Sequence, residues 1–301
     1  MYQIFNRRRF TKLTIMSGIT IGLSGSDFAP GKSVRFGLAT DSHYAEREPA
    51  NNRFYRQALQ RMAEFTAEMN KEQVDFVMHF GDFKDENPNK NSRDTLQYLI
   101  ELEKRYAQFK GPKYHCVGNH DVDSITKNQF LSNIENTGIP KNESFYSFDL
   151  RGFHFVVLDA NFNADGSDQY YLEGADWQDI RIPQNQMEWL KSDLERSPYP
   201  TIVFCHHPLL EYHYKGYKMH IHNFPEVQQL LESSGKVIAV FQGHVHEESV
   251  STIKGIHYVT QNAMVEYDGL ANNCFSIVSI QESVISITGY KRNSSFSLPT
   301  D

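Results

Sequence analysis

The segment VRFGLATDSH, residues 34–43, is an apolar, strand-like run that ends directly at Asp41 and His43. A second segment of the same design, VDFVMHFGD, spans residues 74–82 and ends at an aspartate. Short apolar runs rich in β-branched and aromatic residues predict buried strands. Residues 52–70 lie between the two and carry apolar side chains at helical spacing. A strand, a helix and a second strand in this order predict an α/β fold.

The same pattern continues along the chain. Further helices are predicted at residues 94–109 and 184–196. Further strands are predicted at residues 114–117, 145–150, 153–158, 201–205, 237–241, 256–260, 275–280 and 284–289. Strands and helices alternate at first and strands dominate the end, which predicts a mixed α/β domain with more than one sheet. Because no linker rich in Pro, Gly or Ser divides residues 34–301, we expect them to form one domain.

The composition excludes several classes of protein. A chain of 301 residues with 40% hydrophobic and 22% charged residues can bury a large core, which excludes general disorder. Its net charge of −7 argues against broad nucleic-acid binding, which needs a positive field. Three cysteines exclude a scaffold built on disulfides, whereas thirteen histidines are unusually many. Any metal site is therefore expected to use imidazole and carboxylate ligands.

The first 33 residues differ from the rest of the chain. Basic residues are followed by a modestly apolar stretch at residues 13–23, which is too short for a comfortable membrane span. This layout predicts a cleavable export signal, and the order Arg-Arg-x-Phe-x-Lys at residues 7–12 resembles a bacterial twin-arginine signal. We therefore expect the twin-arginine export machinery as a partner and a periplasmic or extracellular location. A disordered basic tail and an uncleaved anchor are the alternatives.

Metal-capable side chains follow five of the predicted strands. They are Asp41 and His43, then Asp82, then Asn119, His120 and Asp121, then His206 and His207, and finally His244 and His246. In α/β sheets the carboxyl ends of strands border one crevice, so residues distant in sequence meet there. The glycines at positions 81, 118 and 243 precede three of these groups and permit tight turns that bring ligands close. The ordered set predicts a single site.

In this order the groups resemble the calcineurin-like metallophosphoesterase superfamily, over about residues 34–290. The run NRFYR at residues 52–56 is also similar to members related to the ADP-ribose/CDP-alcohol diphosphatases. The resemblance implies a four-layer α/β/β/α sandwich of two mixed β-sheets flanked by helices. It also implies two divalent or trivalent metal ions, for which the ligand types suit Mn, Fe or Zn.

The resemblance assigns a role to each residue of the site. Asp82 bridges the two ions, Asp41, His43 and His246 complete one of them, and Asn119, His206 and His244 complete the other. His120 is the expected general acid for the leaving oxygen. Asp121 is expected to orient the His120 imidazole or to keep it protonated, with a turn cap as the alternative. His207 either faces the substrate or packs in the wall.

Substrate contacts are less defined by the sequence. Arg53 and Arg56 are positioned to reach a phosphate, and a solvated helix face is the alternative for both. The aromatic segment at residues 211–225 either stacks on a base or sugar or forms a folded loop with its own small core. Four histidines on or beside strands, at positions 79, 115, 154 and 257, are expected to be packing or pairing residues.

The sequence therefore predicts an exported dinuclear-metal phosphoesterase that hydrolyses phosphodiester or nucleotide pyrophosphate bonds by attack of metal-activated hydroxide. A phosphomonoesterase on the same scaffold is the first alternative, and a non-catalytic binding protein that kept the fold is the second. The partner is expected to be a small phosphorylated substrate. A nucleic acid as stable partner is not expected, nor is a stable membrane span unless the signal stays uncleaved.

Overall fold

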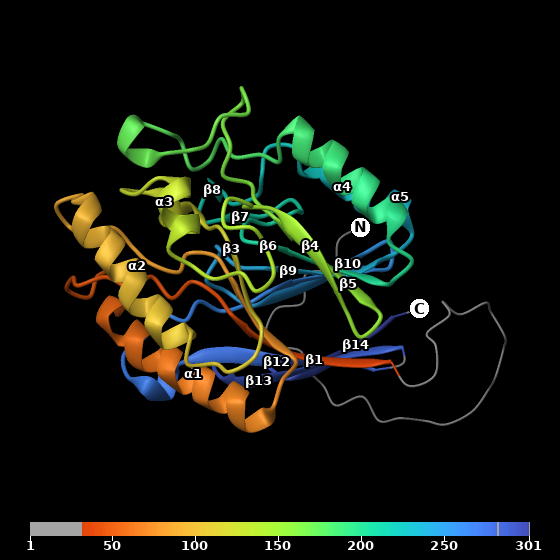
Figure 1. Ribbon diagram of the computed structural model, residues 1–301, viewed down its shortest axis with the longest axis horizontal. Helices are drawn as coiled ribbons and strands as arrows, with labels where there is room; N and C mark the ends of the chain where they lie inside the picture. Colours follow the sequence, from red (N-terminus) through yellow and green to blue (C-terminus); the bar gives the residue numbers. More distant parts are fainter. Residues whose placement is uncertain (1–31, 282, 301) are drawn as a thin grey trace, which may run out of the picture.

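Two β-sheets form the centre of the structure, a computed structural model that describes residues 32–281 and 283–300. The helices cover the outer faces of the two sheets (Figure 1). The predicted export signal falls outside the described residues, apart from Lys32 and Ser33. None of the helices within the described ranges has the length and apolar character needed to cross a membrane.

The first sheet has the strand order β14-β13-β12-β1-β2-β3. Its strands are β1 (Ser33–Ala39), β2 (Phe76–Phe80), β3 (Lys113–Cys116), β12 (Cys274–Gln281), β13 (Val284–Lys291) and β14 (Phe296–Pro299). Strands β1, β2 and β3 run parallel, whereas β12 pairs antiparallel with β1. The sheet is therefore mixed, as predicted.

The second sheet has the order β10-β11-β9-β6-β5-β4 and is also mixed. Its strands are β4 (Tyr146–Leu150), β5 (Phe153–Leu158), β6 (Thr201–Cys205), β9 (Val237–Gln242), β10 (Ser249–Ile253) and β11 (Ile256–Thr260). Strands β5, β6 and β9 are parallel, and β4 and β5 form a hairpin around residues 151–152.

Three apolar layers hold these elements together. Helices α1 (Ala58–Glu72) and α2 (Ser92–Tyr106) pack on the first sheet, and α4 (Gln184–Arg196) and α5 (Phe224–Ser234) pack on the second (Figure 1). The layer between the sheets is strongly aromatic, with Phe36 stacked on Phe76 at 4.9 Å between ring centroids. Strands such as β2 are buried on both faces, and for this reason their sequences are continuous apolar runs. The four-layer α/β/β/α arrangement is confirmed.

Several elements differ from the sequence prediction. The helix expected from residue 52 begins at Ala58, after a short 3₁₀ turn, because Asn51 and Asn52 adopt left-handed backbone angles that a helix does not allow. Helix α5, the short helix α3 (Lys127–Ser132) and the strands β10 and β14 were not predicted.

The aromatic segment 211–225 contains a small hairpin of β7 (His213–Tyr214) and β8 (Tyr217–Lys218). The segment ends at the beginning of α5, where Pro225 occupies the first turn of the helix. Its tyrosine at position 217 is 54% exposed, whereas Ile221 is fully buried, so the segment has both a surface and a small interior.

Candidate metal centre

The predicted ligands converge at the carboxyl ends of five parallel strands. Asp41 and His43 follow β1, Asp82 follows β2 and Asn119 follows β3, all on the first sheet. The remaining ligands, His206, His244 and His246, follow β6 and β9 on the second sheet. The site therefore lies where the loops of both sheets meet, as the order of the motifs predicts.

The backbone at these ligands is unusual. Five of the predicted ligands have left-handed angles, with φ of 53° at Asp41, 46° at His43, 51° at Asp82, 67° at His244 and 65° at His246. Such angles are uncommon outside glycine, although Asp and His tolerate them better than most residues. Strained backbone of this kind collects at functional sites, where surrounding contacts enforce it.

Two glycines allow the ligand loops to approach one another. A Cβ atom at Gly118 would lie 2.2 Å from the backbone nitrogen of Asp82, and one at Gly243 would lie 2.3 Å from Oγ1 of Thr40. Neither separation is possible for real atoms, so both positions require glycine. This confirms the close approach predicted for the loops before Asn119 and His244.

Asp82 lies at the centre of the cluster. Its Oδ2 atom is 3.4 Å from Nε2 of His43 and 3.3 Å from Nε2 of His206. Its other oxygen, Oδ1, accepts a hydrogen bond of 2.8 Å from the backbone nitrogen of His120. The carboxylate therefore faces both halves of the cluster, which is the position that a bridging ligand requires.

One half of the cluster consists of Asp41, His43 and His246. Oδ1 of Asp41 is 3.3 Å from Nε2 of His246, and the Nε2 atoms of the two histidines are 3.2 Å apart. Imidazole nitrogens and carboxylate oxygens that converge in this way match the ligand chemistry of a transition-metal ion.

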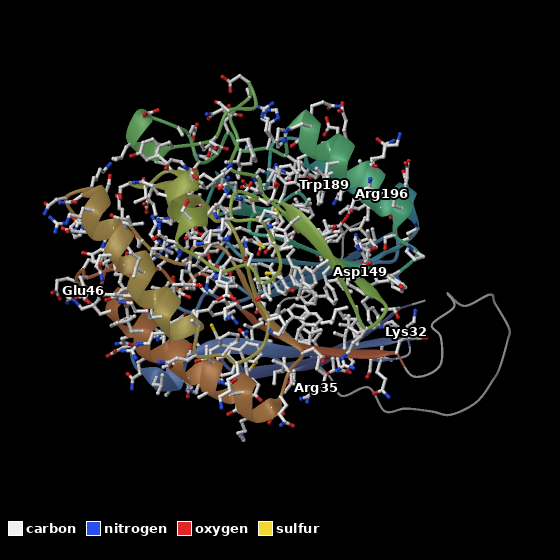
Figure 2. All side chains as sticks on the ribbon, viewed as in Figure 1. Lys32, Arg35, Glu46, Asp149, Trp189 and Arg196 are labelled. Carbon is white, nitrogen blue, oxygen red and sulfur yellow. The ribbon has the colours of Figure 1, made fainter. Side chains whose placement is uncertain are left out.

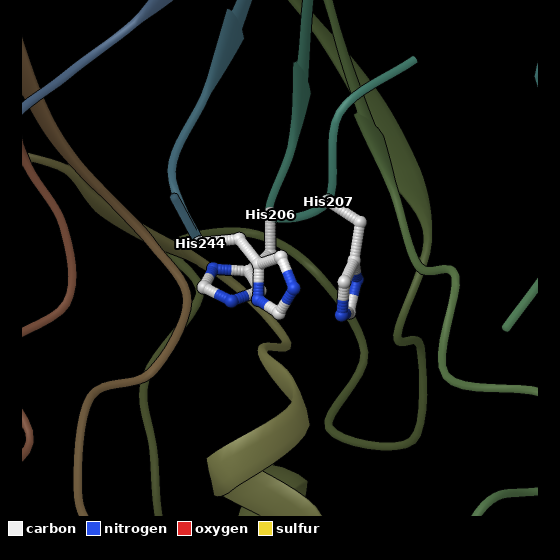
Figure 3. Close-up of side chains that lie close together, drawn as sticks. All are labelled: His206, His207 and His244. Atoms are coloured by element: carbon white, nitrogen blue, oxygen red, sulfur yellow. The ribbon is translucent and has the colours of Figure 1, made fainter. Parts of the chain in front are cut away.

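The other half contains His206 and His244, with His207 beside them (Figure 3). The Nε2 atoms of His206 and His244 and Oδ1 of Asn119 are buried and have no hydrogen-bond partner within the described residues. Buried polar atoms normally have partners, because leaving them unpaired costs free energy. A metal ion would satisfy these three atoms together, so the donor set fits a second ion.

The electrostatics also suit metal binding. Burial opposes ionisation of Asp41 and Asp82, but neighbouring imidazoles hold the pKa of both carboxyls well below the usual range. Burial, aided by the neighbouring imidazole of His206, lowers the pKa of His244 to about 3. Burial likewise holds the pKa of His207 well below its usual range. The carboxylates are thus ionised and the imidazoles of His244 and His207 neutral, as coordination requires. At His206 burial lowers the pKa, but the carboxylates of Asp82 and Asp41 outweigh burial and raise it to about 9, so His206 must release a proton when it binds an ion.

His120 has the opposite character. Burial lowers its pKa, but the carboxylates of Asp85 and Asp82 outweigh burial and raise the pKa to about 9. Its Nδ1 atom is 3.5 Å from Oδ2 of Asp85 and 3.9 Å from Oδ2 of Asp123. A protonated imidazole at the edge of the cluster is what a general acid requires.

The sequence analysis did not identify two carboxylates that support the ligands. Oδ2 of Asp85 is 3.2 Å from Nδ1 of His43, and Oε1 of Glu266 is 2.8 Å from Nδ1 of His246. Such carboxylates fix the orientation of a metal-binding imidazole. Asp85 follows Asp82 by three residues, which is a weak signal, whereas no local pattern marks Glu266.

For Asp121 the structure agrees with the alternative of a turn cap. Its carboxylate accepts hydrogen bonds from the backbone nitrogens of Gly118, Phe83 and Lys84 at 2.8, 2.9 and 3.3 Å. Burial raises its pKa to about 7, with a further contribution from Asp82. Asp121 therefore caps the turns of two ligand loops, and Asp85 occupies the position beside the His120 imidazole.

The two arginines proposed for substrate binding have different surroundings in the structure. Arg53 borders the site, with Nε 4.0 Å from Oε1 of Glu266. Arg56 instead forms exposed ion pairs with Glu46 at 3.0 Å and Glu48 at 2.8 Å, so it belongs to a solvated surface. His207 is fully buried among the histidines, which agrees with a position in the wall.

Two cavities adjoin the cluster. The first, of about 340 Å³, is called here the His120 cavity and is lined by His120, Asn119, Asp123, Tyr171 and Trp177 among others. The second, of about 840 Å³, is called the Tyr267 cavity and is lined by Tyr267, Asn52, Tyr55, Tyr214 and Asn262 among others. Both share the side chains of Arg53, Met219, His244 and His246. The two cavities therefore meet at these four side chains, beside the metal centre.

This geometry agrees with a comparison to known families, because residues 34–248 match the model of the calcineurin-like phosphoesterases. The chain belongs to the calcineurin-like phosphoesterase family. As a member, this phosphoesterase is a metal-dependent hydrolase that acts on phosphoester bonds, and its His/Asp cluster binds two divalent metal ions.

Individual relatives of this phosphoesterase are distant. It is 23% identical to the manganese-dependent ADP-ribose/CDP-alcohol diphosphatase of Oryza sativa, over 77% of this chain and 83% of that protein. It is 30% identical to purple acid phosphatase 23 of Arabidopsis thaliana, over 53% of this chain and 34% of that protein. The crystal structure of a dimetal phosphatase from Danio rerio has the same fold, with a TM-score of 0.76, 19% identity, and coverage of 89% of this chain and 99% of that one.

Proposed function

We propose that this phosphoesterase hydrolyses phosphodiesters and pyrophosphates that carry an organic group at both ends. Its preferred target is the pyrophosphate bond of nucleoside diphosphate-linked compounds. The observation that carries the proposal is the pair of cavities that adjoin the metal centre. A phosphomonoester has a substituent on one side only and would leave one cavity unused. A disubstituted pyrophosphate fills both.

The comparison with relatives supports the same choice. The similarity to the ADP-ribose/CDP-alcohol diphosphatase covers most of both chains, whereas the similarity to the purple acid phosphatase covers about a third of that protein. The diphosphatase is also the relative whose name specifies a substrate with groups on both sides of the phosphates.

The residues of the site have distinct tasks in this reaction. Asp41, His43, Asp82, Asn119, His206, His244 and His246 would hold the two ions. When bound, the ions supply Lewis-acid activation of the attacking water and of the phosphoryl oxygens. Arg53 is positioned to hold a phosphate oxygen through its guanidinium. His120 donates a proton to the leaving oxygen, and Asp85 holds its imidazole in place.

A hydrolysis screen tests the proposal. The manganese-loaded protein should hydrolyse ADP-ribose and bis(4-nitrophenyl) phosphate with a higher kcat/KM than 4-nitrophenyl phosphate. The variant Asp82→Ala should lose more than about a hundredfold in activity, because even the outer partners of metal ligands contribute 10–100-fold. A higher kcat/KM for the monoester would overturn the proposal in favour of a phosphomonoesterase.

The role of His120 is tested separately. His120→Ala should keep both metals and lose about 10²–10⁴-fold in activity on substrates with poor leaving groups. Its loss on nitrophenyl esters should be much smaller, because nitrophenolate leaves without protonation. Equal losses on both kinds of ester would contradict the assignment of His120 as general acid.

We also propose that the protein is exported by the twin-arginine route, so that it acts in the periplasm or outside the cell. The sequence of residues 7–12 and the apolar stretch after it support this proposal. Replacing Arg7, Arg8 and Arg9 by lysine should retain the full chain in the cytoplasmic fraction of a bacterial host. Unchanged export of that variant would refute the twin-arginine route.

A further inference from the structure

The two cavities differ chemically, and the difference indicates which half of the substrate departs. We propose that the His120 cavity holds a nucleobase-bearing half stacked on Trp177, which leaves as the nucleoside monophosphate. The second half, rich in hydroxyl groups, lies in the Tyr267 cavity and receives the oxygen of water. This inference rests on the proposed function and specifies which of the two phosphorus atoms water attacks.

The position of the general acid sets the direction. His120 lines the His120 cavity and is not among the residues that line the Tyr267 cavity. The acid must reach the oxygen that leaves, and in an in-line displacement that oxygen lies opposite the attacking one. The half bonded to the leaving oxygen therefore occupies the His120 cavity.

Trp177 gives this cavity a surface for a planar ring. The indole is half-buried, borders the cavity, and lies 5.8 Å from the ring of His244 between centroids. The buried Gln169 amide donates hydrogen bonds to the carbonyls of Asp176 and Asp179, at 3.0 and 3.1 Å, and so fixes the loop on both sides of Trp177. A fixed indole beside a cavity is suited to stacking on a nucleobase.

The Tyr267 cavity offers different chemistry. Its lining includes the amides of Asn52, Asn262 and Asn272. Their nitrogens donate to Glu266, Arg292 and Asp268 within the protein, which leaves their oxygens as acceptors for hydroxyl groups. Tyr267 borders it with a side chain that is 48% exposed. The lining also includes the carboxylates of Glu247 and Glu248, which accept hydrogen bonds, so this cavity complements the hydroxyl groups of a sugar or polyol.

The proposed step balances without any further reactant. The oxygen of water forms a bond to the phosphorus of the half in the Tyr267 cavity, and one proton of that water passes to solvent. The bond between this phosphorus and the bridging oxygen breaks, and its electron pair stays on the bridging oxygen. That oxygen takes a proton from His120 and leaves as part of the nucleoside monophosphate. The products are this nucleotide and the phosphorylated second half.

Hydrolysis of ADP-ribose in ¹⁸O-labelled water tests the direction with the full, metal-loaded chain. Mass spectrometry should find the label in ribose 5-phosphate and none in AMP. Label in AMP would overturn the inference and leave the proposed function intact. No hydrolysis of ADP-ribose, nor of bis(4-nitrophenyl) phosphate, would overturn the proposed function itself.

Fluorescence tests the stacking independently. The chain has two tryptophans, and Trp189 lies on α4, where its ring packs edge-on against Phe145 at 5.0 Å (Figure 2). The variant Trp189→Phe therefore leaves Trp177 as the single tryptophan. AMP should quench its fluorescence in the metal-loaded protein, and ribose 5-phosphate should not. The reverse pattern would refute the assignment of the cavities.

Kinetics complete the test. Trp177→Ala should raise KM for ADP-ribose roughly tenfold, as expected when one base-stacking contact is lost. Trp177→Phe should restore most of this loss, and the KM for P¹,P²-dimethyl pyrophosphate, which has no ring, should stay within about twofold in both variants. Equal increases in KM for the two substrates would show that Trp177 only shapes the loop.

Discussion

At the scale of single residues, Asp85 contacts two imidazoles with different tasks. Its carboxylate is 3.2 Å from His43, a proposed metal ligand, and 3.5 Å from His120, the proposed acid. Arg47 approaches its other oxygen at 3.2 Å and keeps the carboxylate in place. One buried side chain thus orients groups that come from two different loops.

Asp85→Asn should therefore weaken metal binding as well as acid catalysis. We expect a 10–100-fold lower metal affinity, the usual cost of losing a carboxylate behind a metal-binding histidine. Titration of the metal-free protein with Mn²⁺ in a calorimeter measures it. Asp149→Asn is the matched control, because Asp149 pairs with His154 at 2.6 Å and neither residue is a proposed ligand. Similar losses in both variants would contradict a specific role for Asp85.

The ligands themselves could be predicted from the sequence, but their supporting residues could not. Asp41, His43 and Asp82 stand next to recognisable strands and in a recognisable order. Glu266 supports His246 from twenty residues away, on a loop without a sequence signal. The sequence likewise did not show that Arg53, and not Arg56, borders the site. The guanidinium of Arg56 instead donates hydrogen bonds to Glu46 and Glu48.

At the scale of elements, the turn after β3 depends on one glycine. A methyl group at Gly118 would collide with the backbone nitrogen of Asp82, which cannot move without displacing the central ligand. Gly118→Ala should therefore lose more than about tenfold in activity, as expected for a ligand displaced by a fraction of an ångström. Steady-state kinetics with saturating metal measures the loss.

Gly166→Ala is the control for this turn. Gly166 has a φ of 83° and open space around its Cα atom, so alanine there introduces backbone strain without a collision. This variant should be less stable and fully active. Full activity of Gly118→Ala would show that the loops after β2 and β3 are less tightly fixed than the structure indicates.

A buried arginine of helix α1, Arg61, fixes the loop that carries Glu266. The guanidinium of Arg61 donates hydrogen bonds to the carbonyls of Met264, Glu266 and Tyr267. Arg61→Met would leave one buried and two partly buried acceptors without this donor, at about 1–3 kcal/mol for each acceptor that stays unpaired. We expect the free energy of unfolding, measured in urea, to fall by about 3 kcal/mol or more. Arg56→Met, which removes an exposed arginine, should change it little, and equal effects would contradict the buried role.

At the scale of the whole molecule, the metal centre joins the two sheets. Its ligands come from β1, β2 and β3 on one sheet and from β6 and β9 on the other, so bound ions link both halves of the sandwich. Nε2 of His206 and of His244 are buried without a hydrogen-bond partner among the described residues, and a bound ion would supply one. Metal binding should therefore stabilise the entire fold.

Removal of the metal tests this link. Ions at a hundred times their dissociation constant stabilise a protein by about 2.7 kcal/mol at one site. For a domain of this size, a chelator should lower Tm by roughly 5–10 °C, and added Mn²⁺ should restore it. Differential scanning calorimetry measures the change. An unchanged Tm for protein shown to have lost its metal would contradict the proposed link between the sheets.

The sequence by itself determined the chemistry of this protein. Strand-forming runs, the histidines and carboxylates at their ends, and the glycines before them follow local rules of backbone and side-chain preference. Their order resembled that of one family, and this resemblance implied the four layers and the proposed ligands. The start of α1 was predicted less well than that of α4, because the left-handed residues Asn51 and Asn52 delay α1.

Only the tertiary structure decided how these groups work together. Asp85 rather than Asp121 stands beside His120, because the backbone amides of two ligand loops hold Asp121. The two cavities beside the metal centre, one of them bordered by Trp177, combine segments more than a hundred residues apart. Contacts between distant segments arise only when the sheets pack, so no local pattern encodes them.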